Sequence, residues 1–255
     1  MKITVCELGN DPRQLEADWL SLVSHVHSEG SQLVLLPEMA FYPWLAYNKK
    51  FDSRQWQLAM KAHEDWLLRF PELSPALVCG TRPVIQEGKR LNEALIWHTD
   101  NGCQAVHHKY YLPDEEGFWE ASWYQRGEKD FSIIEVKKLK IGFLICTELW
   151  FSSHARQYGK QGAHLVLCPR ATPASTADKW VAGGRAAAVV AGAYCLSSNF
   201  SGLSQHGNWA GSGWGIDPDG VVLGITSQEQ PFKTIDIDLE RAEAAKNTYP
   251  RYVLD

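Results

Sequence analysis

The sequence predicts an α/β protein built in layers, with helices outside and β-sheets within. Two observations support this fold class. Short apolar runs alternate with amphipathic helical patterns through both halves of the chain, and several strand-like runs follow one another directly. The 255 residues also contain no low-complexity segment and no linker rich in proline and serine, so we expect a single domain over residues 1–255.

In the first half of the chain, a β-rich run at 2–8 precedes a helix whose two ends are marked by the sequence. Asp11 and Pro12 are typical of a helix start, and Gly30 is typical of a helix end. The continuous apolar run that follows predicts a strand covered on both faces. This doubly covered strand lies at about 33–37. A helix is then predicted at about 53–69, followed by three strands at about 76–82, 91–98 and 103–109.

The second half repeats the alternation of strands and helices. Its predicted strands lie at 140–146, 164–168, 193–199 and 232–238, with a further pair around the turn at 217–220. Its predicted helices lie at about 153–161, at 178–193 and, as a short polar helix, after 238.

Between the two halves, residues 110–130 show little periodicity and are dense in aromatic residues and carboxylates. An aperiodic insertion of this length in a compact domain is usually functional.

The composition excludes several classes of function. The net charge of −5 and the pI near 6.0 indicate no basic patch, so nucleic acid is not an expected partner. No apolar run approaches the roughly 18 to 20 residues that span a bilayer, and the N-terminal residues lack the pattern of a signal peptide. We therefore expect a cytoplasmic protein that does not bind membranes.

The six cysteines form neither a CxxC pair nor a close cluster with histidine. This spacing predicts no disulfide framework and no metal site. Most of the cysteines are interpreted as buried, reduced thiols that pack as small apolar side chains. The six cysteines are Cys6, Cys79, Cys103, Cys146, Cys168 and Cys195.

Three chemically active residues each close an apolar run, where the carboxyl ends of strands should meet. Glu38 follows LVLLP, Lys109 ends CQAVHHK and Cys146 ends KIGFLIC. Alone, each has an ordinary interpretation: a solvated glutamate, a surface lysine and a core thiol. Together they provide a base, a cation for an oxyanion and a nucleophile, a combination that is much more specific than any one of them.

The segments around these three residues resemble the nitrilase or carbon–nitrogen hydrolase superfamily, whose catalytic residues are Glu, Lys and Cys in that order. The matching motifs are LPEM, HHKYYLP and GFLICTELWF, with further similarity in GAHLVLCP and DPDGVVL. The resemblance implies a four-layer α-β-β-α sandwich, a homodimer or higher oligomer, and chemistry that needs no metal or organic cofactor. It also implies hydrolysis of a non-peptide C–N bond through a cysteine thioester, with release of ammonia.

Many members of the superfamily carry a second glutamate eleven residues after the lysine. In this chain that position is Glu120. The resemblance implies a catalytic or positioning role for Glu120, whereas the neighbouring Glu115 and Glu116 are interpreted as solvated loop residues.

Four further residues are candidates for substrate binding. The resemblance implies that the backbone N–H of Thr147 stabilises the oxyanion together with Lys109. Where many relatives carry an arginine, this chain has Trp150, which cannot clamp a carboxylate in a bidentate manner. Trp150 and the loop that holds Trp119 are locally similar to the N-carbamoylputrescine amidase branch, and Arg170 could add a positive charge.

The predicted substrate is a small carboxamide or a carbamoyl amine. A nitrile remains an alternative substrate, and an acceptor other than water remains open for the thioester. A further alternative is a catalytically idle interaction module.

Of the 11 tryptophans, six fall in segments expected around the site, which predicts an aromatic-walled pocket around a single thiol. These six are Trp44, Trp119, Trp123, Trp150, Trp209 and Trp214.

Overall fold

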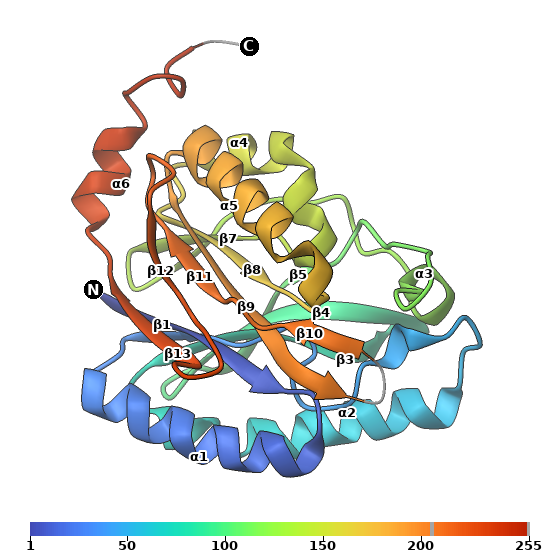
Figure 1. Ribbon diagram of the computed structural model, residues 1–255. Helices are drawn as coiled ribbons and strands as arrows, with labels where there is room; N and C mark the ends of the chain where they lie inside the picture. Colours follow the sequence, from blue (N-terminus) through green and yellow to red (C-terminus); the bar gives the residue numbers. More distant parts are fainter. Residues whose placement is uncertain (205–206, 254–255) are drawn as a thin grey trace.

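The computed structural model describes residues 1–204 and 207–253 and places two β-sheets between two pairs of helices (Figure 1). The described helices are α1 (Pro12–Glu29), α2 (Ser53–Leu67), α3 (Glu120–Trp123), α4 (Ser152–Lys160), α5 (Ala177–Ala191) and α6 (Leu239–Ala245). The described strands are β1 (Lys2–Gly9), β2 (Leu33–Leu35), β3 (Leu77–Gln86), β4 (Lys89–His98), β5 (Gly102–His108), β6 (Ile134–Val136), β7 (Leu139–Phe143), β8 (Leu165–Pro169), β9 (Tyr194–Ser204), β10 (Gly207–Ala210), β11 (Trp214–Ile216), β12 (Val222–Ile225) and β13 (Phe232–Asp236).

The strands pair in two layers that are joined at one place. One layer has the order β5-β4-β3-β2-β1-β13, and the other has the order β6-β7-β8-β9-β11-β12. The two layers are connected where the end of β1 pairs in parallel with β9, at Glu7 to Gly9. Helices α1 and α2 cover one outer face and α4 and α5 cover the other (Figure 1). This arrangement confirms the predicted four-layer α-β-β-α sandwich.

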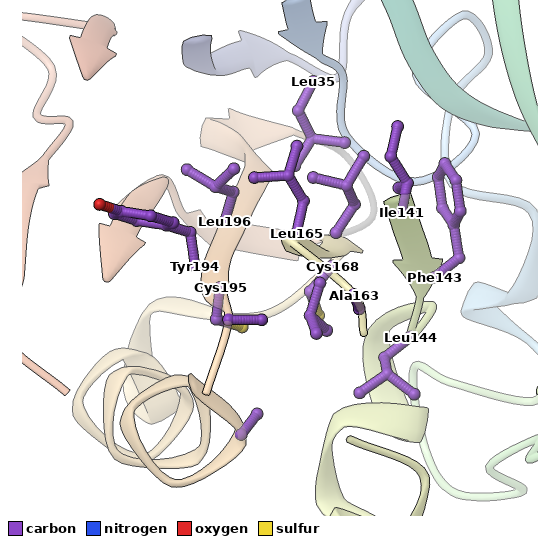
Figure 2. Packing of buried hydrophobic residues seen from close by; sticks show 14 of the residues in the cluster. Leu35, Ile141, Phe143, Leu144, Ala163, Leu165, Cys168, Tyr194, Cys195 and Leu196 are labelled. Carbon is purple, nitrogen blue, oxygen red and sulfur yellow. The ribbon is translucent and has the colours of Figure 1, made fainter. Parts of the chain in front are cut away.

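Strand alternation explains why both faces of the first sheet are apolar. Ile3 and Val5 of β1 point into the core between the sheets, whereas Cys6 and Leu8 belong to the core under α1. Figure 2 shows the core between the sheets, where Leu35 of β2 lies above Leu165 and Leu196 of the other sheet. The run that predicts a doubly covered strand at 33–37 is therefore buried on both sides, although the strand itself ends at Leu35.

The predicted limits of α1 are confirmed by its capping groups. The Asp11 carboxylate accepts hydrogen bonds from the backbone N–H groups of Arg13 and Gln14, and Pro12 occupies the first turn. Gly30 ends the helix in the left-handed conformation, with φ of 66°.

Two differences from the predicted elements bear on the site. The predicted strand at 140–146 ends at Phe143, so Cys146 opens a 3-10 helix, Cys146–Trp150, instead of closing a strand. In addition, the sequence did not predict the strand β6, which pairs with β7 through a turn in which Lys137 and Lys138 have positive φ. Two charged residues without glycine gave no turn signal in the sequence.

No helix in residues 1–204 and 207–253 is both long enough and apolar enough to cross a membrane.

Candidate active site

A cavity of about 320 Å³ lies beside the short helix that begins at Cys146. Cys146, Thr147 and Glu120 are among the residues that line it. Phe118 from the 110–130 insertion, together with Trp150 and Trp180, adds aromatic side chains to its lining. The cavity therefore joins one thiol and one carboxylate to an apolar surface.

Cys146 adopts a backbone conformation that is rare for a residue with a side chain. Its φ is 46°, in the left-handed region, and its side chain is 4% exposed. Residues held in this region are concentrated at functional sites, because the surrounding structure must compensate for the strain. The turn places the thiol in the lining of the cavity instead of in the strand layer.

Glu38 is fully buried and reaches the site from the segment after β2. Its Oε1 accepts hydrogen bonds from Lys109 Nζ at 2.8 Å and from Asn92 Nδ2 at 2.8 Å. Its Oε2 is buried and has no hydrogen-bond partner among the described residues. A buried carboxylate oxygen of this kind is available to accept a proton from a neighbouring group.

Lys109 lies between two carboxylates. Its Nζ lies 2.8 Å from Glu38 Oε1 and 2.7 Å from Glu120 Oε2, and its side chain is completely buried. Tyr124 donates a further hydrogen bond to Glu120 Oε2. The structure thus brings together Glu38, Lys109 and Glu120, the three charged residues for which the sequence predicted a catalytic or positioning role.

The charges of this cluster act on one another and on the thiol. Burial alone lowers the pKa of Lys109, but the carboxylates of Glu120 and Glu38 outweigh it and raise that pKa above its ordinary value. Burial raises the pKa of Glu120 to about 7, and Lys109 opposes this rise. Burial and the Glu38 carboxylate raise the pKa of Cys146, whereas Lys109 lowers it. At rest the site therefore favours a neutral thiol that must lose its proton to a base during reaction.

The sequence analysis missed Glu148, which ties the nucleophile segment to the lysine segment. Its Oε2 accepts hydrogen bonds from Ile145 N at 2.8 Å and from His107 Nε2 at 2.9 Å. Its Oε1 accepts one from Tyr110 N at 2.7 Å. One buried carboxylate thus holds the residues next to Cys146 and Lys109 in a fixed relation. A glutamate two positions after the cysteine, between Thr147 and Leu149, was the available signal.

We expect Glu148→Ala to lower kcat about 100-fold, because displacing reacting groups by about 1 Å has a cost of this size. The variant also leaves one buried and two partly buried donors without their acceptor, so a loss of stability of a few kcal/mol is expected. Measuring kcat together with thermal unfolding tests both effects. Glu135→Ala, at an exposed position of β6, is the control. Wild-type kcat in Glu148→Ala would refute the positioning role.

The four predicted substrate-binding residues fall into two groups. Thr147 and Trp150 line the cavity. Trp119 and Arg170 are not among its lining residues, and Phe118 occupies the place expected for Trp119. The ring of Trp119 instead lies under Lys49 Nζ, at 4.8 Å from the ring centroid.

Arg170 is buried within the protein, and its guanidinium is used by internal hydrogen bonds. It donates to Ser197 Oγ at 2.6 Å, to Thr172 Oγ1 at 2.9 Å and to the carbonyl oxygen of Ser212 at 2.8 Å. This geometry corrects the expectation that Arg170 offers its charge to a substrate.

The aromatic wall is also composed differently from the prediction. Six tryptophans were expected near the pocket, and among the residues that the structure describes only one of the six, Trp150, lines it. Trp180, which is not one of those six, is the second tryptophan of the wall, and its ring centroid lies 4.8 Å from that of Trp150. Trp44 and Trp209 instead pack in a cluster with Phe118 and are not among the residues that line the cavity.

The other cysteines and the metal-ligating residue types give no second site in the described part of the chain. Within residues 1–204 and 207–253, no group of three or more His, Cys, Asp or Glu side chains could hold a metal ion. Cys103 is exposed, whereas the remaining four are buried and have raised pKa values because of that burial.

Comparison with known proteins gives a match over nearly the whole chain. Residues 3–247 match the family described as carbon-nitrogen hydrolase. The crystal structure of a carbon-nitrogen hydrolase from Helicobacter pylori G27 has a TM-score of 0.87 and 19% sequence identity, and the alignment covers 98% of this chain and 94% of that one. This likeness supports the fold described above.

Curated relatives have sequence identities of about one quarter. Citrullinase of Francisella tularensis is 26% identical over 67% of this chain and 61% of its own length. Omega-amidase of Xenopus tropicalis is 25% identical over 90% of this chain and 84% of its own length. N-carbamoylputrescine amidase of Arabidopsis thaliana is 26% identical over 62% of this chain and 54% of its own length, which agrees with the predicted local similarity. The alignments thus span less than two thirds of the first and third relatives.

Proposed function

Because the chain belongs to the carbon-nitrogen hydrolase family, we propose that it is a thiol amidohydrolase with Cys146 as its nucleophile. Its substrate is a small carboxamide or carbamoyl amine, from which it releases ammonia. The named relatives include an omega-amidase and an N-carbamoylputrescine amidase, which supports this range of substrates.

One observation carries the assignment of roles. The Cys146 thiol lines the cavity, and the buried Glu38, whose charge acts on this thiol, has one carboxylate oxygen without a partner among the described residues. Lys109 and Asn92 hold the other oxygen of Glu38, so the carboxylate is fixed in place. A fixed base beside a thiol with a raised pKa is the arrangement that nucleophilic catalysis requires.

In the first half of the reaction, Glu38 Oε2 takes the proton of Cys146 and the thiolate sulfur adds to the carbonyl carbon of the substrate. Negative charge then develops on the carbonyl oxygen. Lys109 Nζ and the backbone N–H of Thr147, in the first turn of its short helix, stabilise this oxyanion, and one such donor is typically worth about 3 to 4 kcal/mol. The C–N bond breaks, Glu38 returns the proton to the leaving nitrogen, and ammonia or an amine departs from the thioester.

In the second half, water replaces the departed nitrogen compound. Glu38, with Glu120 beside Lys109, orients this water and accepts one of its protons while the water oxygen attacks the thioester carbon. The C–S bond breaks and the proton passes to the sulfur, which restores the thiol. Glu120 lines the cavity directly and is therefore assigned a role at this step.

Mass spectrometry of acid-quenched turnover mixtures tests this function. With a panel of linear carboxamides and alkylureas, we expect ammonia release and an acyl or carbamoyl adduct on the peptide that contains Cys146. Cys103, the exposed thiol, serves as the internal control and should carry no adduct. An adduct only on another cysteine would contradict the assignment of the nucleophile. Ammonia from the matched nitriles but not from the amides would contradict the reaction class.

A further inference from the structure

The cavity is lined by two exposed charged residues that the proposed chemistry does not use. Glu115 comes from the 110–130 insertion, and Lys179 comes from the first turn of α5. Both side chains belong to exposed residues and line the same cavity as Cys146. Within residues 1–204 and 207–253, neither side chain forms an ion pair. The mouth therefore presents one free negative and one free positive charge from two different elements.

Helix stability does not explain the position of Lys179. A cation in the first turn of a helix faces the positive end of the helix dipole, which favours acidic residues there. The neighbouring Trp180 packs against Trp150 in the aromatic wall, so the start of α5 is anchored beside the cavity. Lys179 is thus carried by a fixed element at the mouth.

The residues that line the cavity form three chemically distinct groups that differ in burial. Cys146 and Glu120 are buried and are taken as its floor, Phe118, Trp150 and Trp180 contribute rings, and the exposed Glu115 and Lys179 are taken as its mouth. An amide or carbamoyl group suits the floor and a short methylene chain suits the aromatic rings. A group that carries both an ammonium and a carboxylate suits the two opposite charges at the mouth.

We propose that the substrate is a linear ω-amide or ω-carbamoyl compound whose far end is zwitterionic, with its carboxylate held by Lys179 and its ammonium held by Glu115. This inference rests on the proposed function, because it assumes that the amide end reacts at Cys146. It narrows the range of small carboxamides and carbamoyl amines to those with an amino-acid-like far end.

Two substrate series of constant chain length test the proposal, one of linear carboxamides and one of alkylureas. Each series has four members, whose far ends are uncharged, carry an ammonium, carry a carboxylate, or carry both. Exposed ion pairs contribute at most about 1 kcal/mol, which corresponds to about a fivefold preference for each charge. In at least one series, we therefore expect kcat/KM to be highest for the zwitterionic member, and lowest for the uncharged one.

Two variants assign the charges to the residues. Lys179→Met should remove the advantage of the carboxylate and keep that of the ammonium, whereas Glu115→Gln should do the reverse. Glu116→Gln, at an exposed neighbour outside the cavity lining, and Arg185→Met, further along α5, are the matched controls. Each comparison is a ratio of two substrates on one preparation, so any loss of folded protein cancels.

The outcomes separate this inference from the function on which it rests. Equal kcat/KM for all four members, or ratios that both variants leave unchanged, would overturn the zwitterion proposal and leave the amidohydrolase intact. No ammonia from any member of either series would overturn the proposed function, and this inference with it.

Discussion

Cys146→Ala is expected to lower kcat for ammonia release at least about 10⁴-fold, because removing a covalent nucleophile removes the whole two-step route. The alanine leaves Glu38 and Lys109 in place, and these groups cannot form a thioester. The substrate should still bind, since the aromatic lining of the cavity is unchanged. Ammonia release by wild type and by the variant, over the same amide panel, measures the effect.

The stability of the Cys146→Ala variant separates a chemical effect from a structural one. The substitution removes a single sulfur atom at the edge of a cavity, so we expect thermal unfolding close to that of wild type. Cys195→Ala is the matched control, because Cys195 is a fully buried thiol of β9 outside the cavity lining. It should lose about 1 kcal/mol of stability and keep its activity. Equal ammonia release by wild type and Cys146→Ala would end the thiol mechanism.

The sequence predicted the layers and pointed to the candidate catalytic residues for related physical reasons. Strands that are buried on both faces must be continuously apolar, as at 33–37, and a charged residue that ends such a run must lie at the edge of the sheet. Glu38 stood out in this way, whereas Lys109 follows β5, a strand at the end of the sheet whose residues are partly or fully exposed. The structure places the Glu38 and Lys109 side chains 2.8 Å apart. Cys146 stood out by the same argument, although its strand ends three residues earlier than predicted.

The remainder of the cavity could not be predicted, because its side chains are selected by three-dimensional packing. In the aperiodic 110–130 insertion, Phe118 lines the cavity and the adjacent Trp119 does not, a difference that depends on the path of the loop. Trp180 lies on α5, where an aromatic residue usually indicates a core face. The burial of Arg170 depends on Ser197, Thr172 and Ser212, which lie 2 to 42 positions away in the sequence.

Lys109→Met is expected to reduce both stability and activity strongly, because Lys109 neutralises two buried carboxylates at once. Without the ammonium group, Glu38 and Glu120 remain in the interior with no compensating cation between them. Breaking a buried ion pair in this way typically costs about 3 to 5 kcal/mol. The oxyanion also loses a donor, so kcat should fall about 10³-fold or more. Chemical denaturation and ammonia release measure the two effects.

The pH dependence of this loss has a definite sign. Burial raises the pKa of Glu120 from its ordinary value of 4.5 to about 7, and Lys109 opposes this rise, so removing the lysine raises the pKa further. The folded variant then holds the proton more tightly than the unfolded chain does. Its stability is greatest below 4.5 and falls as pH increases through the folded pKa. The deficit relative to wild type should therefore widen from acid to alkaline pH.

A second substitution separates the two consequences of removing the lysine. Lys109→Met combined with Glu120→Gln removes one of the uncompensated carboxylates, so stability at neutral pH should partly recover while activity stays low. Lys61→Met is the matched control, since Lys61 pairs with Asp65 at 2.9 Å on the exposed face of α2. An exposed pair contributes at most about 1 kcal/mol, so this control should remain near wild type in both measurements. Wild-type stability of Lys109→Met at alkaline pH would show that the two carboxylates do not depend on the lysine for their charge balance.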